Sequence, residues 1–187
     1  AVVLVFTVVA NGALVRTAAT MFGFVIPPMQ TPPDWAAAKD TLAPWLTNAA
    51  IVLTTDELSA LYYLGRYDVV INKSRLSEFR GADEFSLDPR TGRPVITTPE
   101  SLDLIIDCYP DGLIVADGTR WRDPAHVDAG VIHVIEARAD QVKLPAAAMH
   151  AYFWRQPDDA GRAEACAHLP ARLGEKAMAG LERSHAP

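Results

Sequence analysis

The sequence predicts an α/β fold with a mostly parallel sheet, preceded by a hydrophobic segment of the membrane type. From about residue 31 to residue 155, short apolar runs rich in β-branched residues alternate with stretches of helical periodicity. That order is typical of parallel strands joined by helices. Before it, residues 1–28 carry a single charge, Arg16. A chain of 187 residues has room for one compact domain plus additional segments.

The N-terminal segment, residues 1–28, has two interpretations. Its first 15 residues read AVVLVFTVVANGALV without a charge, and MFGFVIPPM continues the apolar character after Arg16. A membrane-spanning helix needs ~20 apolar residues, so this run fits the final turns of one. Because the chain starts at Ala1 directly in this run, we expect the C-terminal part of a longer protein. The alternative is a buried strand, since AVVLVF is β-branched and Asn-Gly follows it.

We place the body of the domain at residues 31–155. The sequence of its first half predicts the order helix, strand, helix, strand. Thr31-Pro32-Pro33-Asp34 is a helix start with a capping residue and an early proline. AAIVLTT is a short buried strand, and LSALYYLG is a helix that ends at Gly65 before the strand DVVIN. The residues expected on the buried face of the first helix are Trp35, Ala38, Leu42 and Trp45.

The second half of the body predicts a β-hairpin insertion and then a return to the alternating pattern. FSLDPRTGRPVIT places turn residues between two short extended runs. A helix starts at Thr98-Pro99 and leads to the strand LIVAD, and VIHVIEARADQV is read as a further helix after Gly130. MHAYFW is the last expected strand. Residues 156–187 lack a continuous apolar face, which predicts a frayed helix or a disordered tail.

Composition and motifs exclude several classes of function. The net charge of −6 comes from 23 acidic and 17 basic residues, so nucleic acid is not an expected partner. Cys108 and Cys166 show no CxxC or Cys/His spacing, and therefore indicate neither a disulfide framework nor a zinc site. GxGxxG, GxxxxGK[ST] and GxSxG are absent from the sequence. We therefore predict no cofactor, no metal and no catalytic residue within this chain.

Candidate binding residues follow from the expected sheet. Ligands of open α/β sheets usually bind beyond the carboxyl ends of the strands. The polar or aromatic residues that follow the three predicted central strands are Thr54, Thr55, Asp56, Asn72, Lys73, Asp117, Gly118 and Trp121. A structural role is the stronger alternative for the first three, because a helix start needs such side chains for its free N–H groups. Trp121, flanked by two arginines, is expected to be partly exposed.

The order of several motifs resembles the soluble C-terminal domain of bacterial polytopic glycosyltransferases of the protein-mannosyltransferase and aminoarabinose-transferase type. The motifs are PDWAAAKDTLAPWL, AAIVLTTDELSALYYLGRYDVVI, DPRTGRPVITTPESLDLII and GLIVADGTRWRDP. The resemblance, over about residues 15–154, implies a Rossmann-like three-layer domain after the last transmembrane helix.

The family resemblance also implies a function for the parent protein. Such enzymes transfer a sugar from a polyprenyl-phosphate donor to an acceptor outside the cytoplasm, so the expected location is the cell membrane with the domain on the extracytoplasmic side. Their catalytic acid lies in an early loop that no residue here matches, which leaves this part a supporting, non-catalytic role. The alternative is a soluble Rossmann-like binding or interaction domain without a transferase parent.

Overall fold

A computed structural model describes residues 32–74, 85–88, 91–156 and 160–184. The described residues lie within one compact unit, residues 32–187. The hydrophobic segment at residues 1–28 therefore lies outside the described residues. Within the described ranges, no helix has both the length and the apolar character needed to cross a bilayer.

The described domain contains a seven-stranded sheet in the order β3-β4-β2-β1-β5-β7-β6. Its strands are β1 (Ile51–Thr54), β2 (Val69–Ile71), β3 (Phe85–Leu87), β4 (Pro94–Ile96), β5 (Asp111–Asp117), β6 (Asp140–Val142) and β7 (Met149–Arg155). The central strands β4, β2, β1 and β5 are mutually parallel. Strand β7 is antiparallel to both β5 and β6, and β3 forms the expected hairpin with β4. Five of the seven strands thus run in one direction, and the predicted mostly parallel α/β sheet is confirmed.

One face of the sheet is covered by α3 (Trp35–Asn48), α4 (Glu57–Ser59) and η1 (Ala60–Leu64), a π-helical turn that continues α4. Asp34 caps α3 by accepting a hydrogen bond from the backbone N–H of Ala37, while Thr31 lies outside the described residues. The α3 side chains buried against the strands are Trp35, Ala38 and Leu42, as expected, while Trp45 is 36% exposed. Gly65 ends η1 with a φ of 76°, a left-handed conformation that favours glycine.

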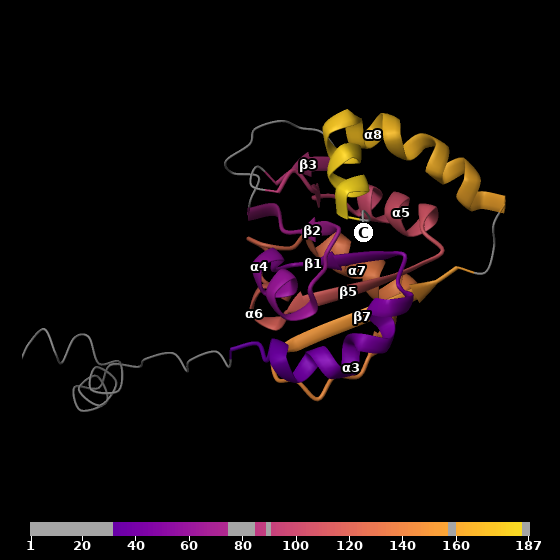
Figure 1. Cartoon of the computed structure of the whole chain (residues 1–187). Helices are drawn as coiled ribbons and strands as arrows, with labels where there is room; N and C mark the ends of the chain where they lie inside the picture. The colour runs from indigo at the N-terminus through magenta and orange to yellow at the C-terminus, as the bar shows by residue number, and fades with distance from the viewer. Residues whose placement is uncertain (1–31, 75–84, 89–90, 157–159, 185–187) are drawn as a thin grey trace, which may run out of the picture. The chain divides into compact units, whose positions relative to one another are not determined.

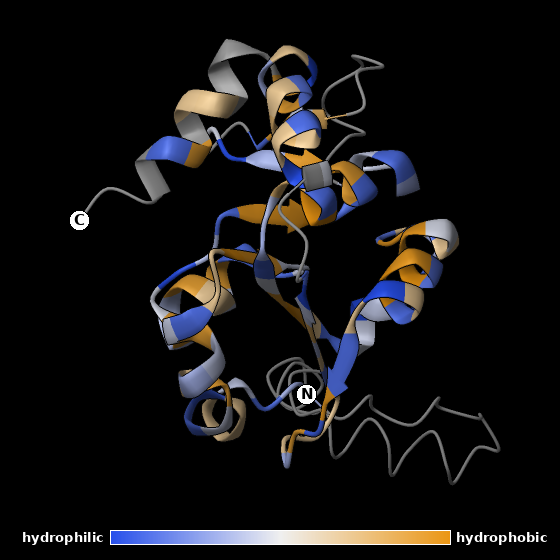
Figure 2. Ribbon diagram, turned by 90° about the vertical axis from the view of Figure 1, so that its right-hand side faces the viewer, coloured by the Kyte–Doolittle hydropathy of each residue, from blue (hydrophilic) through white to orange (hydrophobic). Residues whose placement is uncertain are grey.

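The opposite face carries α5 (Pro99–Cys108), α6 (Gly118–Trp121), α7 (Ala129–Arg138) and α8 (Ala160–Ser184). Figure 1 shows α5 and α8 on one side of the strands and α3 on the other, which makes three layers. Along these helices hydrophobic and hydrophilic residues alternate (Figure 2), as expected where one face packs on a sheet. Thr98 caps α5 in a reciprocal arrangement with Ser101. The capping prediction at Thr98-Pro99 is confirmed.

One expectation for secondary structure is wrong, and another is met in part. Asp140–Val142 forms the edge strand β6 and not the end of a helix, because its backbone pairs with β7. Of the two alternatives for the segment after Arg155, a frayed helix or a disordered tail, the helical one is met, because residues 160–184 form the 25-residue helix α8. Its leucines at 169, 173 and 181 are at most 7% exposed and belong to the same apolar cluster as α5. The spacing of four and eight residues keeps these leucines on one face.

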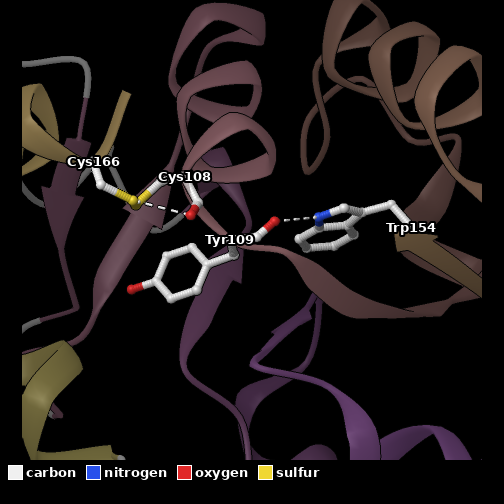
Figure 3. The surroundings of a disulfide bond; sticks show 4 residues. All are labelled: Cys108, Tyr109, Trp154 and Cys166. Atoms are coloured by element: carbon white, nitrogen blue, oxygen red, sulfur yellow. Dashed lines mark hydrogen bonds between the residues drawn. A yellow bond between two sulfur atoms is a disulfide. The ribbon is translucent and has the colours of Figure 1, made fainter. Parts of the chain in front are cut away.

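A disulfide between Cys108 and Cys166 joins the end of α5 to α8, contrary to the sequence-based expectation (Figure 3). The two residues are 58 positions apart, and their Cα atoms are 4.7 Å apart. The neighbouring Tyr109 carbonyl accepts a hydrogen bond from the Trp154 indole at 3.2 Å. Close packing of α8 on α5 brings the cysteines together, and no local spacing motif signals that contact.

Candidate functional site

The candidate residues gather at the carboxyl ends of β1 and β5, which are neighbouring parallel strands. The chain after β1 enters α4 and η1 on the α3 side of the sheet. The chain after β5 enters α6, whose Trp121 packs in the cluster on the α5 side. Loops that leave adjacent parallel strands toward opposite faces open a crevice between them, where open α/β sheets usually bind ligands. The fold therefore places these residues at the expected kind of site.

Thr54 and Thr55 are both fully buried at the end of β1. The Thr55 hydroxyl accepts a hydrogen bond from the backbone N–H of Asp117 at 2.8 Å, so it fixes the end of β5 to the end of β1. The Thr54 hydroxyl accepts a hydrogen bond from the Asp56 backbone N–H at 3.1 Å. Asp56 caps α4 through the backbone N–H of Ser59 at 3.2 Å. These residues hold the strand ends and the helix start in register.

Arg120 lies at the centre of the site and is the residue that sequence reasoning missed. Its guanidinium forms ion pairs with Asp56 at 3.2 Å and with Asp117 at 3.7 Å. It also donates a hydrogen bond to the Thr55 carbonyl at 3.4 Å. The second oxygen of Asp117 accepts hydrogen bonds from the backbone N–H and the hydroxyl of Thr119. The sequence signal was present, because an arginine three residues after Asp117 at a helix start can turn back onto that carboxylate.

Asn72 and Lys73 follow β2 beside this cluster. Asn72 is 3% exposed, donates to the Thr55 carbonyl at 3.4 Å, and accepts from the Ser74 hydroxyl at 2.7 Å. The Lys73 ammonium lies 3.6 Å from Asp128, the residue that caps α7. Asn72 therefore joins the network of Thr55, whereas the side chain of Lys73 pairs with a different element.

Trp121 is a core residue, and the expectation of a partly exposed side chain is wrong. It is 0% exposed and stacks on Tyr152 and His150, with centroid distances of 5.4 and 6.0 Å. Burial lowers the pKa of His150, and the nearby Arg122 guanidinium lowers it further. Burial also raises the pKa of the Tyr152 phenol. The charged arginines on either side of Trp121 thus gave a misleading signal, because α6 turns the indole inward.

The arrangement stabilises the edge of the sheet more than it prepares chemistry. One guanidinium pairs with both carboxylates, and the buried hydroxyl and amide groups of the cluster bond to backbone groups of the neighbouring elements. A nucleophile or a general base needs a side chain with a reactive group free to meet a substrate. Across the described ranges, no three His, Cys, Asp or Glu side chains come together as a metal site. Within those residues, the cluster is a structural polar network.

The chain matches no protein-family model, no curated protein and no solved structure.

Proposed function

We propose that the described domain is the extracytoplasmic, non-catalytic part of a membrane glycosyltransferase that uses a polyprenyl-phosphate sugar donor. The observation that carries the proposal is the disulfide between Cys108 and Cys166. Structural disulfides form and persist in secreted, periplasmic and other oxidising environments, and are rare in the cytosol. The disulfide therefore supports an extracytoplasmic location, in agreement with the location that the motif resemblance implies.

The polar network at the carboxyl edge supports the non-catalytic part of the proposal. Arg120 occupies the crevice between β1 and β5 and pairs with both carboxylates there. A substrate that entered this crevice would have to displace those ion pairs and leave partly buried charges unpaired, which is costly. The domain then serves the enzyme by packing over the membrane part and shaping the acceptor side.

A Rossmann-like topology is part of the same proposal. Numbered in chain order, the parallel strands β1, β2, β4 and β5 lie in the spatial order 3-2-1-4. That order corresponds to the first four strands of a Rossmann sheet, in which the order reverses between strands 1 and 4. The antiparallel strands β7 and β6 depart from it after the fourth strand.

An exposed apolar face on α4 and η1 is suited to contact with another protein surface. Leu58, Leu61 and Tyr62 are 62%, 49% and 81% exposed, and their spacing of three and four residues places them on one side. Exposed apolar groups that cluster in this way are typical of interaction sites. The face fits contact with the membrane part of a transferase. It equally favours the second candidate function, a soluble Rossmann-like interaction domain.

Deletion of residues 1–28 separates the two candidates. The transferase proposal predicts that the full chain, when exported to the periplasm, fractionates with membranes and requires detergent for its extraction. It predicts that the shortened chain is soluble, cooperatively folded and oxidised at Cys108 and Cys166, as measured by urea denaturation and by maleimide alkylation before and after reduction. A shortened chain that fails to fold contradicts the membrane-anchor interpretation and favours the soluble alternative.

Transferase activity needs its own test. Membranes that contain the gene's full product are supplied with a radiolabelled polyprenyl-phosphate sugar, and transfer to endogenous acceptors is measured. We expect transfer that persists when Arg120 is replaced by Lys, which retains the positive charge among the carboxylates. Absence of transfer with every polyprenyl-phosphate sugar supplied would refute the enzymatic part of the proposal.

A further inference from the structure

A pocket of about 330 Å³ lies away from the carboxyl-edge cluster, between α3 and the β6 edge of the sheet. Its size falls within the range of small-molecule sites, about 300–1,000 Å³. The residues that line it are Thr41, Trp45, Asp140, Gln141, Val142, Lys143 and Phe153. Asp140 and Val142 pair with Phe153 and Ala151 of β7, residues that belong to the α3 side of the sheet. Cross-strand partners share a face, so Asp140 and Val142 lie on the α3 side as well.

Trp45 gives the pocket an aromatic wall. Its ring centroid lies 4.7 Å from that of Phe153, and the two planes are tilted by 53°. Phe153 is 7% exposed, so it holds one part of Trp45 in place, while 36% of Trp45 stays accessible. The other tryptophans, at positions 35, 121 and 154, are at most 3% exposed. An indole held at the surface in this way departs from the burial pattern of the rest of α3, and such departures are expected at functional sites.

The polar side chains of the pocket have unused hydrogen-bonding capacity. Thr41, Asp140 and Lys143 make no side-chain hydrogen bond or ion pair with any residue in the described ranges. They supply a hydroxyl, an acceptor carboxylate and a donor ammonium around the aromatic wall. The carboxyl-edge cluster differs sharply, because there Arg120 already engages Asp56 and Asp117.

We propose that this pocket binds a carbohydrate, with one pyranose ring lying against Trp45. A pyranose has a face of C–H groups that packs on an aromatic ring, and a rim of hydroxyls that both donate and accept hydrogen bonds. The Asp140 carboxylate would accept hydrogen bonds from that rim, and the Lys143 ammonium would donate hydrogen bonds to it. The Thr41 hydroxyl can do both. The lining carries one acid and one base, and the whole chain has a net charge of −6, which disfavours nucleotides and other phosphorylated ligands. The inference stands on the pocket and does not require the transferase proposal.

The exposure pattern of the tryptophans gives a selective assay. Acrylamide, a soluble quencher, reaches Trp45 far more readily than the three buried indoles. The full chain, in detergent micelles, is titrated with the methyl α-pyranosides of glucose, mannose and galactose, and with the acyclic polyol sorbitol. We expect at least one pyranoside to protect the tryptophan fluorescence from acrylamide, and sorbitol to have no effect.

Variants then locate the site, with binding followed by ligand-observed NMR of the sugar. Trp45→Ala is expected to weaken binding by about tenfold or more, as for removal of a central aromatic contact. Asp140→Asn should weaken it less, and Tyr62→Ala, which removes an exposed aromatic outside the pocket, should leave it unchanged. Circular dichroism verifies that each variant is folded.

Two results would overturn the inference. The first is that no pyranoside binds better than sorbitol. The second is sugar binding that is the same in Trp45→Ala and Asp140→Asn as in the unaltered chain. Neither result bears on the location or the transferase activity proposed for the domain, because those are measured by alkylation, fractionation and sugar transfer.

Discussion

Replacing both Cys108 and Cys166 by serine should lower the free energy of unfolding by about 4 kcal/mol. The disulfide closes a loop of 58 residues, and the chain-entropy model gives about 4 kcal/mol for a loop of this length. The effect acts mainly on the unfolded chain, which becomes freer when the bond is removed. Loss of native packing should be small, because a serine hydroxyl is close to a thiol in size.

Urea denaturation followed by tryptophan fluorescence measures the effect. With a slope of about 2 kcal/mol per M of urea, the midpoint of the double variant should fall by about 2 M relative to the oxidised chain. The unaltered chain in dithiothreitol is the matched control, and its midpoint should fall by a similar amount. Hydrogen exchange should also speed up first in α8, because the disulfide and its leucine face hold that helix on α5.

A different outcome would refute this reasoning. If the double variant and the oxidised chain have the same midpoint and slope, the disulfide does not constrain the unfolded state. If two thiols react with maleimide in the untreated, unfolded chain isolated from the periplasm, the bond is not formed there. That second result would also remove the main support for an extracytoplasmic location.

Three further perturbations test the site and the core. Arg120→Ala leaves the two carboxylates of the carboxyl edge without their cation and should lower the free energy of unfolding, measured by urea denaturation, by about 2 kcal/mol. The control Arg122→Ala, in an exposed ion pair, should lower it by less than about 0.5 kcal/mol. Equal losses of stability in the two variants would contradict a structural role for the network. Gly112→Ala places a Cβ 2.0 Å from the buried indole paired with it and should destabilise the fold by about 2 kcal/mol or more, while Gly161→Ala, with open space around it, should be neutral or stabilising in a thermal melt. The pKa of His150 is lowered in the folded state, so the unfolded chain binds the proton more readily, and stability should fall as the pH drops below 6.5 toward that lower pKa. His150→Gln should flatten this part of the profile of stability against pH. An unchanged profile would contradict the lowered pKa of His150.

Most of the parallel core could be predicted from the sequence. IVLT, VVI and LIVAD are short apolar runs between helical stretches, and their β-branched character separates buried strands from short buried helices. Turn residues between Leu87 and Pro94 predicted the hairpin, and Thr98-Pro99 predicted the start of α5. These signals are local, because each depends on neighbours within one or two turns of the chain.

The errors come from contacts between residues that are distant in the sequence. The polar character of the sequence does not change between α7 and residues 140–142, and only pairing with β7 makes these residues a strand. The leucines of α8 are diluted among alanine and charged residues, so their apolar face becomes evident only when α5 packs against it. Because its neighbours are charged, Trp121 was expected to be partly exposed, but α6 directs its side chain into the core.

The candidate site shows the same division. The rule for open α/β sheets correctly brought Thr55, Asp56, Asn72 and Asp117 to one edge, because all of them end or follow parallel strands. The rule could not show that Arg120 fills the space between them. Whether a crevice is open or occupied depends on where one long side chain points, and that choice is made by the three-dimensional packing around it.

By itself, the sequence determined the order of helices and strands through the parallel part of the sheet, the parallel direction of the central strands and the edge at which its polar residues collect. These follow from backbone propensity, apolar periodicity and caps, which act over a few residues. Only the tertiary structure decided the Cys108–Cys166 pairing, the inward turn of Trp121 and the pocket beside Trp45. Each of these joins segments from different parts of the chain, and such contacts are set by the packing of whole elements against one another.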